Sequence, residues 1–149
     1  MFSVRWTRVL LGGLVAGVVI NACEYLLNGV LLAERWADAM RALNHAASFN
    51  NTEIAAFNIW GFLMGIGAVW LYASIRDHYG PGLRTAIYAG LAVWLIGCAL
   101  GAIPAAAMNV FPRSLFMYGI LMGLFEILAG TLAGAWLYRP AEMTIPAHA

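Results

Sequence analysis

Charged residues are scarce in this chain. Asp, Glu, Lys and Arg make up 10% of its 149 residues, whereas an average soluble protein has about 25%. The formal net charge is only +1, and nucleic-acid binding needs a clustered basic face, so we expect no nucleic-acid partner. Hydrophobic residues account for 63% of the chain, and the mean hydropathy is +0.80. This composition indicates an all-α, polytopic integral membrane protein of one domain, residues 1–149, with the lipid bilayer as a partner.

Histidine is too rare and too poorly placed to build a metal or haem site. The three histidines, His45, His78 and His148, lie outside the hydrophobic runs and have no second ligand at a metal-binding spacing. A structural metal site needs about four converging ligands, and a haem needs an axial ligand inside the fold. We therefore predict no metal and no cofactor.

Cysteine is equally rare. Cys23 and Cys98 are too few for a disulfide framework, and they lack the CxxC spacing of thiol redox motifs. Both fall at a similar depth in hydrophobic runs, so a disulfide between them is possible, but two free thiols packed in the bundle are the favoured interpretation. No nucleophile stands in a recognisable signature with a histidine, so we predict no catalytic residue and no enzyme activity.

Four hydrophobic runs are long enough to cross the hydrocarbon core of a bilayer, which takes about 20 helical residues. They cover residues 9–27, 55–75, 85–103 and 115–138, and they predict a four-helix bundle. All eight basic residues are arginine. One side of the predicted bundle has Arg5, Arg8, Arg76, Arg84 and Arg139, and the other has Arg35, Arg41 and Arg113. Because cytoplasmic loops carry the excess of basic residues, we expect both termini in the cytoplasm.

The segment between the first two runs has a helical pattern of its own. Residues 31–44 place Trp36 and other apolar side chains on one face, which predicts an amphipathic helix on the outer membrane surface. A solvated loop helix packed on the bundle would show the same periodicity. Asn50 with Glu53 three residues later resembles a capping box that opens the second span. Residues 140–149 are predicted to be a disordered tail.

Small residues recur at helical spacing in every run. Each predicted span has at least one pair of glycines four residues apart, which lets two helices approach closely in lipid. The predicted helix-packing residues are Gly13, Gly17, Gly61, Gly65, Gly97, Gly101, Gly119, Gly123, Gly130 and Gly134. Contacts between the four spans of one chain would cover only some of these glycine faces. We therefore expect a homo-oligomer or docking onto other membrane subunits.

The last run carries an acid near its midpoint. Glu126 is the only charged residue within 115–138, and on a helix it shares one stripe with the neighbouring glycines. An ionised group left unpaired at mid-membrane costs between about 2.5 and more than 10 kcal/mol. We therefore expect a polar partner, a proton or water at Glu126, which makes it a possible proton or substrate site.

Other polar residues are predicted to lie toward the outer side of the bundle. Asn21, Glu24 and Asn28 share a stripe on the first span, and Asn58 falls at a similar depth on the second. They complete the possible proton or substrate site as the lining of an outward vestibule. An alternative is that Glu24 lies near enough to the outer interface to reach water, which lowers the cost of its charge.

Some segments of the chain are typical of one group of membrane proteins, namely residues 8–17, Asn21, Glu24, and residues 60–62, 70–73 and 133–138. With these segments the chain resembles, over most of its length, a family of small bacterial inner-membrane proteins with four spans and no assigned activity. The resemblance implies a four-helix fold in the bacterial inner membrane, and it implies no reaction.

Two function classes follow from these patterns. The favoured one is a structural or accessory membrane subunit, because no second charged group is expected at the depth of Glu126 to form a relay. The alternative is a small transporter or channel for protons, cations or small molecules that uses Glu126.

Overall fold

The computed structural model describes residues 4–138, and Arg139 with the predicted tail at 140–149 lies outside the described residues. Within that range all regular structure is helical, which agrees with the predicted fold class. Two segments, η1 and η2, are π-helical. The elements are α1 (Trp6–Glu24), η1 (Tyr25–Leu31), α2 (Ala33–Ala42), α3 (Asn51–Tyr79), α4 (Leu83–Trp94), η2 (Leu95–Ala99), α5 (Leu100–Ala107) and α6 (Arg113–Leu137).

Four helical units are long and apolar enough to cross a membrane, as the four hydrophobic runs predict. They are Trp6–Leu31, Asn51–Tyr79, Leu83–Ala107 and Arg113–Leu137. Three of them extend past the predicted ends by two or more residues on both sides, because helical hydrogen bonding continues beyond the apolar stretch until a cap or turn stops it. The first unit gains most of its extra length through η1, which the sequence pattern did not reveal.

A capping box opens α3, as the sequence predicts. The Asn50 side chain accepts hydrogen bonds from the backbone N–H groups of Thr52 at 2.9 Å and Glu53 at 3.1 Å. The Glu53 carboxylate in turn accepts from the Asn50 backbone N–H at 2.8 Å. Each of these bonds satisfies a donor that the first helical turn would otherwise leave free.

Helix α2 is shorter than its predicted range, because residue 31 belongs to η1 and the chain turns after Ala42. Ala39 is its buried residue. Ala39 clusters with Leu27, Leu32 and Leu115, and Trp36 packs against the same cluster. Helix α2 is therefore attached to the bundle through its apolar face.

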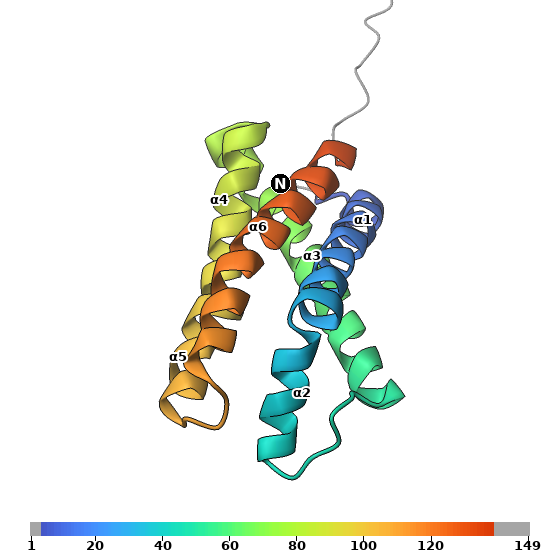
Figure 1. The fold of residues 1–149 in the computed structure, drawn as a ribbon. Helices are drawn as coiled ribbons and strands as arrows, with labels where there is room; N and C mark the ends of the chain where they lie inside the picture. The colour runs from blue at the N-terminus through green and yellow to red at the C-terminus, as the bar shows by residue number, and fades with distance from the viewer. Residues whose placement is uncertain (1–3, 139–149) are drawn as a thin grey trace, which may run out of the picture.

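Helices α1, α3 and α6 approach one another at glycines. A Cβ atom at Gly13 would lie 2.6 Å from the Ile66 Cα of α3, and one at Gly130 would lie 2.8 Å from the Ala16 carbonyl oxygen of α1. Figure 1 shows α6 crossing from beside α5 at one end to beside α1 at the other. Glycines placed at such close approaches are Gly12, Gly13, Gly17, Gly61, Gly65, Gly130 and Gly134.

The remaining predicted packing glycines lie in looser surroundings. Nothing lies within 4 Å of a Cβ atom built at Gly101 or Gly119, and one at Gly123 would meet its neighbours at ordinary contact distances. At Gly97 the close neighbour is the flexible end of Met64. Close packing within one chain therefore uses the glycines of α1, α3 and the second half of α6.

The two ends of the bundle differ in packing. At the end where the chain begins, Tyr138 connects the end of α6 to the segment before α1 and to α3. Its hydroxyl accepts a hydrogen bond from the Arg5 backbone N–H at 3.3 Å, and its ring lies edge-on to that of Tyr72 with 6.0 Å between centroids. Toward the other end, which we call the α2 end, η2 and α5 contain no buried residue. The closest packing is where α1 meets α3 and α6, whereas α5 lies beside the first half of α6 at the α2 end (Figure 1).

Candidate functional site: a buried acidic pair

Glu126 lies in the interior of the bundle. Its exposed fraction is 3%, and among residues 4–138 it is the one charged residue that is buried. Helix α6 positions it on its packed face, one turn from the buried residues Gly123 and Gly130. A carboxyl group removed from water in this way is costly unless another polar group or a proton compensates it.

The compensating group is a second carboxyl group. The Glu126 carboxyl group lies within hydrogen-bonding reach of the carboxyl group of Glu24 on α1, and we call these two residues the acidic pair. The prediction that no other charged group lies at the depth of Glu126 is wrong. The α1–α6 contact fixes the register, because a Cβ atom at Gly130 would meet Ala16 and Ile20 of α1. The preceding turn of α6, which holds Glu126, therefore lies opposite the turn of Glu24.

Asn28 and Trp36 continue the polar contacts from the acidic pair to α2. The Asn28 amide nitrogen donates a hydrogen bond to Glu24 Oε2. Asn28 Oδ1 in turn accepts a hydrogen bond from Trp36 Nε1 at 2.9 Å. Trp36, Asn28, Glu24 and Glu126 therefore form one chain of side-chain contacts, which we call the polar chain.

Asn21 and Asn58 stand apart from the polar chain. The Asn21 amide donates to the Asn58 backbone carbonyl at 3.1 Å, which links α1 to α3. The Asn58 amide donates to the Ile54 carbonyl of its own helix at 2.8 Å. The five residues of the predicted site thus divide into two groups: Glu24, Asn28 and Glu126 lie together, whereas Asn21 and Asn58 join two helices.

Hydrogen-bond accounting limits the charge of the acidic pair. Two ionised carboxylates have only acceptors, so a hydrogen bond between Glu24 and Glu126 needs a proton on one of them. Glu126 Oε2 is buried and has no hydrogen-bond partner among the described residues. A second negative charge there would be both unpaired and repelled by the first. The geometry therefore suits a pair that holds one proton.

Two thiols border the acidic pair. Cys23 and Cys98 are free, and both lie near enough to Glu24 and Glu126 to interact with them electrostatically. Cys98 Sγ is 3.7 Å from the Cβ position of Gly123. Residues 4–138 contain no group of three or more His, Cys, Asp or Glu side chains placed to hold a metal ion.

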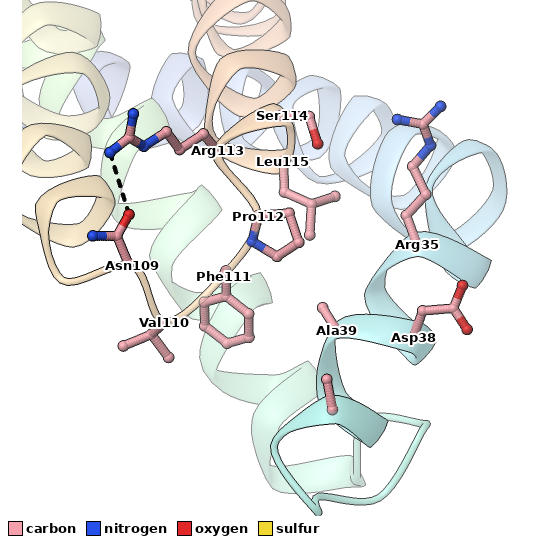
Figure 2. Close-up of a pocket in the computed structure, with 11 residues that line it drawn as sticks. Arg35, Asp38, Ala39, Asn109, Val110, Phe111, Pro112, Arg113, Ser114 and Leu115 are labelled. Atoms are coloured by element: carbon pink, nitrogen blue, oxygen red, sulfur yellow. Dashed lines mark hydrogen bonds between the residues drawn. The ribbon is translucent and has the colours of Figure 1, made fainter.

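An open groove of about 670 Å³ lies at the α2 end. Figure 2 shows α2 forming one wall and the segment that leads into α6 forming the other. It is lined by Arg35, Asp38, Ala39, Ala42 and residues 109–115. The groove thus lies on the surface of the Ala39–Leu115 cluster against which Trp36 packs, and none of the predicted vestibule residues lines it.

Sequence reasoning missed Trp36 and the π-helix that carries Asn28. The pattern of residues 31–44 predicts only that Trp36 lies on an apolar face, because apolar positions do not show which polar atom an indole N–H reaches. A π-helix has no simple sequence signature, although such segments occur often at functional sites.

Comparison with known proteins gave no match: no family model fits the chain, and no curated protein or solved structure is significantly similar to it.

Proposed function

We propose that this chain is an integral membrane protein of a bacterial inner membrane, with both termini in the cytoplasm and α2 at the outer surface. Large apolar side chains on the outside of the long helices support this, such as Ile96 with 71% and Leu63 with 63% of its surface exposed. Contact with lipid tails would be favourable for these side chains, whereas exposure of so large an apolar surface to water would be costly. The excess of arginine at the end where the chain begins supports the orientation.

We further propose that the protein carries protons and that the acidic pair is the carrying site. The observation that supports this most strongly is the close approach of the Glu24 and Glu126 carboxyl groups, with Glu126 only 3% exposed. Ionisable groups inside the bilayer are expensive and mark ion pathways and proton relays. A pair that holds one proton can take up a second proton, which leaves both carboxyl groups neutral, and then release one again, so it never carries two negative charges.

The polar chain supports access to the pair from the α2 end. Glu24 is partly exposed and its neighbour Asn28 connects to Trp36 of α2. On the opposite side, α1 and α6 meet at backbone contact, since a Cβ atom at Gly12 would lie 2.6 Å from the Gly134 oxygen. We therefore propose a carrier whose present conformation faces outward, and the packed half of α1 and α6 would have to loosen for inward release.

Proton uptake by liposomes tests this proposal. Purified protein would be reconstituted with a pH-sensitive dye inside, and a potassium diffusion potential would drive protons inward. We expect faster acidification than in empty liposomes, and Glu126→Gln should reduce it to the empty level. Asp77→Asn removes an exposed carboxylate near the end of α3 and serves as the matched control. Equal rates in wild-type protein and Glu126→Gln would refute proton carriage through the pair.

A second candidate function is that of a structural or accessory subunit in a homo-oligomer or larger membrane complex. The open surface of η2 and α5, together with the empty space beside Gly101 and Gly119, favours it. Native mass and subunit composition in mild detergent test this candidate. Unrelated subunits in fixed ratio would support it, whereas a bare monomer would contradict it.

A further inference from the structure

We infer that Trp36 is a positioning residue that fixes, through Asn28, which carboxyl group of the acidic pair carries the shared proton. The inference rests on the proposed proton-binding role of the pair. The inference gives a functional role to α2, a short helix outside the four long helical units. Oε2 of buried Glu126 has no hydrogen-bond partner among the described residues, so a negative charge on Glu126 would be poorly compensated.

The first step concerns the orientation of one amide. The indole N–H of Trp36 can donate a hydrogen bond but cannot accept one. It donates to Asn28 Oδ1, so the oxygen end of this carboxamide must face α2. The nitrogen end then faces Glu24 and donates to Glu24 Oε2. Without Trp36 the amide could turn over, because its two ends have nearly the same size and shape.

The second step concerns the proton. Because Asn28 donates to Glu24, the Glu24 carboxyl is favoured as the ionised acceptor, and the hydrogen between the two acids belongs to Glu126. Burial acts in the same direction, since Glu126 is buried whereas Glu24 is partly exposed. The other titratable groups that interact with the pair are the thiols Cys23 on α1 and Cys98 on η2, which add no charge to the site while they are protonated.

Trp36 is held by contacts from two connecting segments. Its ring lies edge-on to Phe111, with 5.4 Å between centroids, and to Phe49, with 6.3 Å. Phe49 precedes α3, and Phe111 belongs to the wall of the groove in Figure 2. A displacement of α2 or of either segment would move the indole N–H from Asn28, so the α2 end can control where the proton lies.

Infrared spectroscopy of the protein in lipid bilayers tests the inference. The carbonyl band of a protonated glutamic acid reports its hydrogen bonding, and Glu126→Gln and Glu24→Gln assign the band. Trp36→Phe keeps an aromatic ring between Phe49 and Phe111 but removes the N–H donor. Trp70→Phe, with 45% of its surface exposed in the wild-type protein, is the matched control. Circular dichroism would verify that each variant keeps its helices.

We expect a single carbonyl band in the wild-type protein, absent from Glu126→Gln and retained in Glu24→Gln. Trp36→Phe should add a second band that Glu24→Gln removes, because Asn28 can then turn and leave the proton on Glu24. Trp70→Phe should match the wild type. In an Asn28→Ala background, Trp36→Phe should have no further effect, which a purely structural role would not explain.

Two results separate the inference from the proposed function. A band that depends on Glu126 but is identical in wild-type protein and Trp36→Phe would overturn the role of Trp36 and leave proton binding standing. The absence of any band that depends on Glu126 would overturn proton binding at the pair and the inference with it.

Discussion

Gly12 of α1 and Gly134 of α6 are in backbone contact. A Cβ atom at Gly12 would lie 2.6 Å from the Gly134 carbonyl oxygen, and one at Gly134 would lie 2.5 Å from the Gly12 carbonyl oxygen. Contacts this short leave no room for a side chain at either position. The contact fixes the register of two antiparallel helices, and this register brings Glu24 opposite Glu126.

Substitution of Gly134 by alanine should therefore destabilise the bundle. The added methyl group would meet backbone, which cannot turn aside as a flexible side chain can, so we expect a loss of about 1–3 kcal/mol in the free energy of unfolding. Gly119→Ala is the matched control on the same helix, because nothing lies within 4 Å of its Cβ position. Unfolding of both variants in mixed detergent micelles measures the difference, and equal stability would refute the proposed contact.

Glu126→Gln should leave the fold intact. The glutamine side chain has nearly the same shape as protonated glutamic acid, and its amide can donate to the Glu24 carboxylate without a shared proton. We expect an unchanged elution profile in mild detergent and a change in unfolding free energy of less than about 1 kcal/mol. Loss of folded protein would show that the wild-type carboxyl is ionised and held by a partner that an amide cannot replace.

Removal of the capping box should weaken the start of α3. Asn50→Ala deletes the side-chain acceptor for the backbone N–H groups of Thr52 and Glu53, and N-cap changes of this kind cost about 1 kcal/mol. Hydrogen exchange of the first turn of α3 is the sensitive measurement. Asn50→Asp keeps an acceptor and should exchange as slowly as the wild type; equally fast exchange in both variants would mean that the cap contributes little.

Trp94→Phe should loosen the contact between the α4–η2 segment and α6. The Trp94 indole N–H donates to the Ile120 carbonyl at 2.9 Å, and a hydrogen bond between membrane helices contributes about 0.6 kcal/mol on average. We expect a loss of that size in unfolding free energy, compared with no loss in Trp70→Phe. A Trp94→Phe variant as stable as the control would assign the docking of α4 to apolar contacts alone.

Much of this architecture could be predicted from the sequence, because hydrophobic length and cap residues act locally. The four long helices and the Asn50 cap are of this kind. The partner of Glu126 could not be predicted, because it depends on the helix register set by Gly12 and Gly134, which are far apart in the chain. Counting glycine pairs does not show which of them pack inside one chain, since Gly119 carries the same motif as Gly130 yet faces open space.

The role of Trp36 shows a second limit. Its place on the apolar face of α2 predicted packing, and the structure adds a hydrogen bond to Asn28 across η1. This bond requires the π-helix and the turn before α2 to aim both side chains at each other, and neither feature has a periodic pattern in the sequence. Directional contacts of single polar atoms are thus the part that sequence periodicity leaves undetermined.

The most direct test of the central claim is infrared spectroscopy of the wild-type protein and Glu126→Gln in the same bilayers, with Asp77→Asn as control. If Glu24 and Glu126 share a proton, the wild type and Asp77→Asn will show the carbonyl band of a buried carboxylic acid at neutral pH. Glu126→Gln will lack that band, because Glu24 is then the acceptor of two amides and carries no proton. A wild-type spectrum without the band, or a band that survives in Glu126→Gln, would contradict the shared proton.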